Sequence, residues 1–166
     1  MGRLLGSTSP TRPSRAQTRD ASRREAQAHL RSDVAKILLD TDVCIAILNR
    51  DERVRDQLDR HRPSAVRMSA ITLAELRFGV AKSKHAARAK ANLNVLMSKV
   101  SVVPFDDAAT LRYGELRALL EKRGTPIGPL DTLIAAHALS LRWPLATHNV
   151  REFRRVPGLR VEDWLG

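Results

Sequence analysis

The chain has 166 residues, 43% of them hydrophobic and 28% charged, which is enough for one domain with a hydrophobic core and too short to predict two. It contains no apolar run of about 18 residues, and its amino terminus lacks the apolar stretch of a signal peptide, so we expect a cytoplasmic protein. The formal net charge of +11 at pH 7 favours an anionic partner, and nucleic acid more than a membrane, because no basic amphipathic helix has an aromatic-rich apolar face.

Residues 1–35 differ in composition from the rest of the chain. They are rich in Ser, Thr, Arg and Ala, carry seven Arg against three acidic residues, and show no sustained apolar stripe. This composition predicts a basic, disordered extension. It is either an arm that binds nucleic acid or a dispensable segment, and we favour the second interpretation. Residues 36–166 are predicted to form the folded domain, which is basic by itself with 22 Lys and Arg against 15 Asp and Glu.

From residue 36 onward, short β-branched or leucine-rich runs alternate with helical stretches. This alternation is typical of βαβ units and predicts an α/β fold with a parallel sheet. We expect strands at residues 36–39, 66–69, 100–105, 144–147 and 159–162. We expect helices at residues 54–61, 71–82, 86–97, 108–123 and 130–141, and a short one that begins near residue 43. The helix at 130–141 is apolar nearly all round, so it should be the most buried.

Three acidic residues occupy positions for which a purely structural role is hard to find. Asp40 ends the first strand, Glu75 lies in the apolar helical segment AITLAELRFGV, and Asp131 follows PIGPL in the first turn of the most apolar helix. Each position lies at, or on the helix after, the carboxyl end of a strand, where an open α/β sheet forms its ligand crevices. We therefore expect the three carboxylates to converge.

Structural explanations remain open for two of these acids. Asp40 is also compatible with a helix cap, and Asp131 with a carboxylate stabilised by the dipole at a helix amino terminus. Glu75 has no such explanation, because its neighbours are apolar and a buried carboxylate needs a partner. We expect Asp42 to cap the helix that follows the first strand.

Convergence of three carboxylates predicts a bound cation. At about 5 Å and an effective dielectric constant near 20, each pair repels by roughly 3 kcal/mol, and three pairs together by about 10 kcal/mol, which is comparable to the stability of a domain. Mg²⁺ relieves this repulsion and prefers carboxylate, water and phosphate oxygens as ligands. A metal held by carboxylates in a basic protein is suited to phosphodiester hydrolysis.

Four segments resemble a known family in their order and spacing over roughly 130 residues: LLDTDVCIAIL, SAITLAELRFGVAKS, PIGPLDTLIAAHAL and THNVREFRRVPGLRVEDW. They resemble the PIN-domain ribonuclease toxins of the VapC type. The resemblance implies a three-layer α/β/α fold with a central, mainly parallel sheet of about five strands. It also implies an endoribonuclease that depends on Mg²⁺, with Mn²⁺ as a substitute, and cuts tRNA or ribosomal RNA. The implied partners are a VapB-like antitoxin, a second copy of the chain in a homodimer, and promoter DNA bound through the antitoxin complex.

The resemblance also assigns roles to individual residues. Asp40, Glu75 and Asp131 match the metal-binding acids of the family. The fourth position, often Asp, is Asn149 in this chain, which adds no charge and leaves the number of metal ions open.

Three further residues are expected near the reacting phosphate. Thr147 is expected, with the amide of Asn149, to position water or phosphate, and Arg151 to contact a phosphate. Ser69 is a candidate for supporting hydrogen bonds, although an ordinary strand-to-helix cap is the favoured interpretation of SAIT.

Three other functions stay open on the sequence alone. A metal-free ribonuclease would use histidine and the ribose 2′-hydroxyl, and of the five His only His148, beside Asn149, falls near the predicted site. Such an enzyme would leave cyclic phosphates and ignore chelators. A non-catalytic basic module would use its acids only to dock a basic side chain of a partner, and a DNA nuclease is a third alternative. Cleavage and binding assays with and without EDTA separate a metal-dependent nuclease from the metal-free ribonuclease and from the non-catalytic module.

Overall fold

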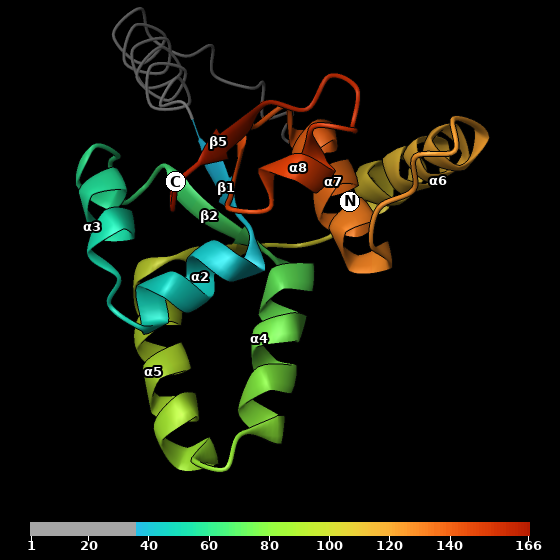
Figure 1. Ribbon diagram of the computed structural model, residues 1–166. Helices are drawn as coiled ribbons and strands as arrows, with labels where there is room; N and C mark the ends of the chain where they lie inside the picture. Colours follow the sequence, from blue (N-terminus) through green and yellow to red (C-terminus); the bar gives the residue numbers. More distant parts are fainter. Residues whose placement is uncertain (1–35) are drawn as a thin grey trace, which may run out of the picture. The chain divides into compact units, whose positions relative to one another are not determined.

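The computed structural model describes residues 36–166 (Figure 1), so the predicted extension at residues 1–35 lies outside the described part. Five strands form one sheet in the order β3-β2-β1-β4-β5, and every neighbouring pair is parallel. The strands are β1 (Ile37–Leu39), β2 (Val66–Ser69), β3 (Ser101–Val103), β4 (Leu145–Thr147) and β5 (Val161–Asp163). The predicted five-stranded parallel sheet is confirmed.

Seven helices connect and cover these strands within residues 36–166. They are α2 (Thr41–Leu48), α3 (Glu52–Asp59), α4 (Ala70–Lys82), α5 (Ala86–Lys99), α6 (Asp107–Lys122), α7 (Pro129–Leu141) and α8 (Val150–Phe153). The short helix α8 was not predicted, because four residues are too few to show a helical period.

The start of α2 differs from the prediction. Asp40 is the N-cap residue, with extended backbone angles, and its carboxylate accepts a hydrogen bond from the N–H of Thr41. The helix therefore begins at Thr41, and the prediction that Asp42 caps it is wrong. Asp42 instead lies in the first turn of the helix, where its side chain is free to reach another element.

Alternate side chains of the central strand enter two separate cores. Leu38 packs with residues of α6, α7 and β4 on one face of the sheet. Ile37 and Leu39 pack with residues of α2, α4 and α5 on the other. This alternation follows from the period of two in a strand and produces the three-layer α/β/α arrangement.

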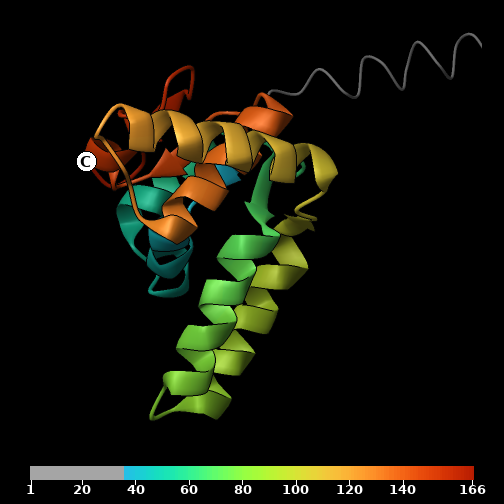
Figure 2. The same ribbon diagram turned by 90° about the vertical axis from the view of Figure 1, so that its right-hand side faces the viewer.

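Helix α7 is the most buried helix, as its composition predicts, with six buried residues between Thr132 and Ala138. Helices α4 and α5 form a hairpin that projects away from the sheet, whereas α6 packs along α7 (Figure 2). No helix within residues 36–166 is long and apolar enough to cross a membrane.

Candidate active site

Asp40 lies at the carboxyl edge of the sheet, where β1 passes directly into α2 (Figure 1). It is only 5% exposed. One carboxylate oxygen accepts the N–H of Thr41 at 2.7 Å, and the other accepts the hydroxyl of Thr147 at 2.7 Å. Thr147 ends β4, the strand beside β1, so the sheet order brings together two residues that lie 107 positions apart.

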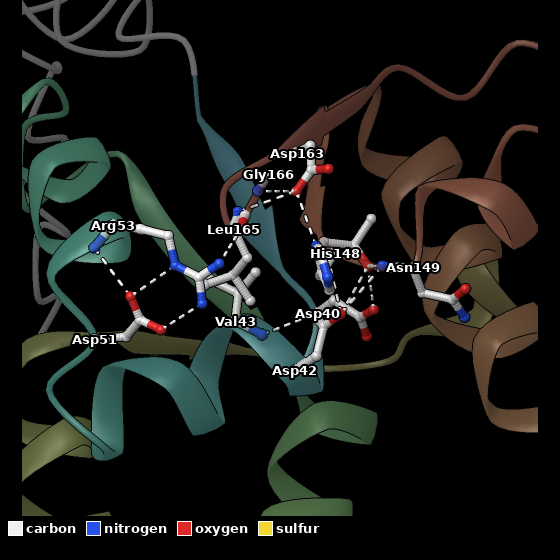
Figure 3. Close-up of polar contacts among 11 residues, drawn as sticks. Asp40, Asp42, Val43, Asp51, Arg53, His148, Asn149, Asp163, Leu165 and Gly166 are labelled. Carbon is white, nitrogen blue, oxygen red and sulfur yellow. Dashed lines mark hydrogen bonds and ion pairs between the residues drawn. The ribbon is translucent and has the colours of Figure 1, made fainter.

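Asp42 connects α2 to the turn between β4 and α8. Its carboxylate accepts hydrogen bonds from the backbone N–H of His148 at 2.8 Å and of Asn149 at 3.2 Å, and the hydroxyl of Thr147 lies 3.3 Å away (Figure 3). Sequence reasoning missed this role. The pattern DTD after a buried strand was the available signal, because it places a second carboxylate one residue beyond the strand's edge.

Glu75 reaches the same edge from α4. Its carboxylate accepts a hydrogen bond from the hydroxyl of Thr41 at 2.5 Å, and the side chain is half-buried. Thr41 thus lies between two of the predicted acids, because its N–H contacts Asp40 and its hydroxyl contacts Glu75. Within residues 36–166, Glu75 forms no ion pair with Lys or Arg.

Asp131 lies in the first turn of α7 and faces a second acid that the sequence reasoning missed, Glu152 of α8. The pKa of Asp131 is raised to about 6, first by burial and then by the charges of Glu152, Glu75 and Asp42. Asp131 lies in the first turn of α7, where the helix dipole stabilises a carboxylate, so the alternative of a favourable charge at the helix amino terminus stays open beside a role in the site.

The five carboxylates Asp40, Asp42, Glu75, Asp131 and Glu152 are called the acidic cluster below. The pKa of Asp40 is raised to about 7, first by burial and then by the charges of Asp42 and Asp131. Within residues 36–166 no Lys or Arg forms an ion pair with any member of the cluster. The cluster is therefore an uncompensated concentration of negative charge at one edge of the sheet.

Comparison with known proteins decides the family. Residues 37–159 match the PIN domain family. The chain is 41% identical over 130 residues to the tRNA(fMet)-specific endonuclease VapC of Salmonella typhimurium, which covers 78% of this chain and 98% of the relative. The chain belongs to the VapC ribonucleases of the PIN-domain family. It is also 36% identical over 129 residues to ribonuclease VapC2 of Rickettsia felis, covering 76% of this chain and 96% of the relative.

A solved structure of a VapC relative has the same fold. The crystal structure of DNA-bound VapBC from Salmonella typhimurium superposes with a TM-score of 0.74 at 41% identity, and the alignment covers 78% of this chain and 98% of that chain. Membership of the VapC ribonucleases disfavours both the non-catalytic module and the DNA nuclease that the sequence left open.

The acidic cluster fits a hard divalent cation in its chemistry. It offers carboxylate oxygens and threonine hydroxyls, and no described cationic side chain neutralises it. Within residues 36–166, however, no three His, Cys, Asp or Glu side chains are arranged to bind one metal ion directly. These two observations agree for Mg²⁺, because Mg²⁺ retains several waters and takes only one or two carboxylates directly.

The remaining predicted residues divide into those at the cluster and those away from it. Thr147 contacts Asp40, as described, and Asn149 donates only its backbone N–H. The side-chain amide of Asn149 forms no hydrogen bond to any described residue. The Ser69 hydroxyl accepts the N–H of Ile71 as the cap of α4 and contacts His137 Nδ1 at 2.8 Å, so it supports α4 and α7 and contacts none of the acids.

Two other side chains near the turn after β4 point elsewhere. The exposed Arg151 forms no hydrogen bond to any described residue. The imidazole of His148 contacts Asp163 at 3.3 Å. Since His148 was the only histidine expected near the site, the geometry gives no support to a metal-free mechanism that uses histidine.

Proposed function

We propose that this protein is a Mg²⁺-dependent endoribonuclease that acts in the cytoplasm as the toxin of a toxin–antitoxin pair and cuts tRNA. The observation that carries the proposal is the acidic cluster, whose member Asp40 is buried and has no cationic partner among the described residues. The relative from Salmonella typhimurium is named as specific for tRNA(fMet), which favours tRNA over ribosomal RNA as the substrate class.

Each residue of the site has a separate role in the proposed reaction. Asp40 and Asp131 would hold Mg²⁺ directly or through water, and Glu75 would complete the set of ligands. When bound, Mg²⁺, or Mn²⁺ in its place, would supply an activated water and would neutralise charge that develops on the phosphate. Thr41 fixes two carboxylates, because its N–H binds Asp40 and its hydroxyl binds Glu75. The side-chain amide of Asn149 has no partner among residues 36–166 and can bind a phosphate oxygen or water.

The partners follow from the relatives and from the surface of this chain. Two of the solved relatives are VapBC complexes from Rickettsia felis and Salmonella typhimurium, both bound to DNA. We propose that this chain forms a homodimer, binds a VapB-like antitoxin, and contacts promoter DNA through that complex. Support comes from the large apolar side chains that the structure leaves exposed on α2, α4, α5, α6 and α7: Ile45, Phe78, Val95, Leu111 and Leu130.

The test is expression of the wild type beside Asp40→Asn and Asp131→Asn, followed by mapping of RNA ends. Asp59→Asn, an exposed change on α3 away from the cluster, is the matched control. Growth arrest and Mg²⁺-dependent cleavage that leaves 5′-phosphate and 3′-hydroxyl ends are expected from the wild type and the control only. Equal cleavage by the two cluster variants, or cleavage that survives EDTA, would contradict the mechanism.

A further inference from the structure

A hollow lined by three arginines lies at the opposite edge of the sheet from the acidic cluster. Arg142 and Trp143 precede β4 and Arg160 precedes β5, so these residues lie at the amino ends of parallel strands, whereas Asp40 and Thr147 lie at the carboxyl ends. Together with Arg112 of α6 they line a hollow of about 350 Å³, called the arginine hollow below. A water molecule takes about 30 Å³ in the liquid, so the hollow has room for a phosphate group and its hydrating waters.

The backbone fixes the positions of these arginines. Arg142 follows α7 in the left-handed conformation, with φ of 56°, and turns the chain toward β4. The guanidinium of Arg160 donates a hydrogen bond to the carbonyl of Arg142 at 3.1 Å. This hydrogen bond connects the two segments that lead into β4 and β5. The ammonium of Lys36, at the entrance to β1, lies 5.2 Å from the centroid of the Trp143 ring and adds a fourth positive charge nearby.

The charge of the arginine hollow is not neutralised by the described part of the chain. None of its lining residues is acidic. Arg112 pairs with Glu115 at 3.0 Å, but Arg142 and Arg160 form no ion pair within residues 36–166. All three arginines are exposed, so their guanidinium groups are accessible to a ligand from solution. A guanidinium binds phosphate oxygens in a bidentate manner, which makes a phosphate the anion that suits this hollow.

We propose that the arginine hollow binds a backbone phosphate of the RNA substrate, remote from the bond that is cleaved. This inference rests on the proposed function, because its ligand is the substrate of the acidic cluster. A three-residue strand spans about 10 Å, so the two sites are separated by at least the height of the sheet. A folded RNA can contact both edges, whereas a dinucleotide bound at the acidic cluster is too short to reach the hollow. The hollow therefore favours structured RNA through affinity, without a role in the chemistry.

The test measures RNA binding without catalysis. The full chain carrying Asp40→Asn is titrated in EDTA with labelled tRNA and with a dinucleotide, at several salt concentrations. Arg142→Gln with Arg160→Gln removes two charges from the hollow, and Arg88→Gln with Lys90→Gln on the exposed surface of α5 removes two charges elsewhere. The hollow variant should bind tRNA about tenfold more weakly and lower the slope of log affinity against log salt by about 1, with a smaller effect in the control and none on the short RNA.

Further arms separate the other outcomes. Inorganic phosphate titrated alone, followed by NMR, should shift resonances of the hollow in the parent and not in the Gln variant. Phosphate binding with unchanged tRNA affinity would mean that the hollow takes a free anion and would overturn the proposal, as would equal tRNA binding by the hollow and control variants. Arg142→Lys with Arg160→Lys should restore part of the affinity, and thermal unfolding confirms that each variant is folded. Because no step needs metal or cleavage, failure of the proposed mechanism leaves this result interpretable.

Discussion

In the metal-free protein, the ionised carboxylate of Asp40 lowers the stability of the folded state. Its pKa is raised from 3.8 to about 7, first by burial and then by Asp42 and Asp131. A carboxyl whose pKa is higher in the folded state makes the folded protein less stable as pH rises through the window from about 4 to about 7. Asp40→Asn should remove this loss, because an asparagine can keep contacts with Thr41 and Thr147 and carries no charge.

We therefore expect Asp40→Asn to raise the free energy of unfolding by about 3 kcal/mol at pH 8 in EDTA, with little change at pH 4. Urea denaturation at both pH values measures the effect. Asp59→Asn, on the exposed surface of α3, should show no such difference. A loss of stability at pH 8 equal to that at pH 4 would mean that the cap contact of Asp40 matters at both pH values and that the negative charge of its carboxylate does not lower stability.

Residue chemistry also explains which residues of the site could be predicted from the sequence and which could not. Asp40, Glu75 and Asp131 were noticeable because each is a charged residue in an apolar context. Asp42 and Glu152 were missed because their local context is ordinary: Asp42 looks like a helix cap, and Glu152 lies among basic residues in NVREFRR. Their roles depend on the partners they meet in space, the turn after β4 for Asp42 and Asp131 for Glu152.

At the scale of elements, the start of α7 is built to place Asp131. Gly128 is the N-cap of α7, and a Cβ added there would lie 2.8 Å from a carboxylate oxygen of Asp131. Its φ of −52° is one that alanine adopts without strain, so the backbone does not require glycine at this position. The glycine instead leaves space for the carboxylate of Asp131 to fold back over the helix end.

Gly128→Ala should therefore lower activity without lowering stability. Displacement of the Asp131 carboxylate by a few tenths of an ångström or more is expected to reduce kcat by about tenfold, while the free energy of unfolding changes by less than about 1 kcal/mol. Gly114→Ala on α6 is the matched control, since an added Cβ there meets nothing within 4 Å, and it should keep full activity. Equal kcat in both variants would show that Asp131 need not occupy its observed position.

Most elements could be predicted from the sequence because their periods are strong. The apolar runs before Asp40 and before Ser69 mark strands, and the all-round apolar segment of α7 marks a buried helix. The errors fall at the ends of elements and on the shortest helix, α8. Helix α2 starts at Thr41 because the carboxylate of Asp40 binds its N–H, a contact that spacing alone does not distinguish from a cap at Asp42.

At the scale of the whole molecule, the sheet order determines which acids meet. The order β3-β2-β1-β4-β5 places β4 beside β1, so Thr147 contacts Asp40 and the turn after β4 contacts Asp42. Strand periodicity predicts that these residues lie at one edge but does not give the neighbours of each strand. The sequence therefore predicted that the acids lie at one edge, whereas the contacts between individual residues follow from the strand order that the structure shows.

Metal binding should make the stability of the whole domain depend on Mg²⁺. A ligand that binds only the folded state raises its stability in proportion to the logarithm of ligand concentration over Kd, which is about 1.4 kcal/mol at ten times Kd. For a domain of this size that corresponds to an increase in Tm of about 3 to 5 °C. The increase should be larger at pH 8 than at pH 5.5, because Mg²⁺ binds carboxylates in the ionised form and the pKa values of Asp40 and Asp131 are raised to about 7 and about 6.

Thermal unfolding in 10 mM Mg²⁺ or in EDTA, at both pH values, measures this coupling directly. Asp131→Asn should abolish most of the increase, whereas Asp59→Asn should retain it, because Asp59 is exposed on α3 away from the cluster. An equal increase in all three proteins would indicate a general salt effect. Identical Tm values with and without Mg²⁺ in the wild type at pH 8 would mean that the acidic cluster binds no metal in the free protein, and that its charge is neutralised only by a metal that arrives with RNA or by a basic side chain of a partner.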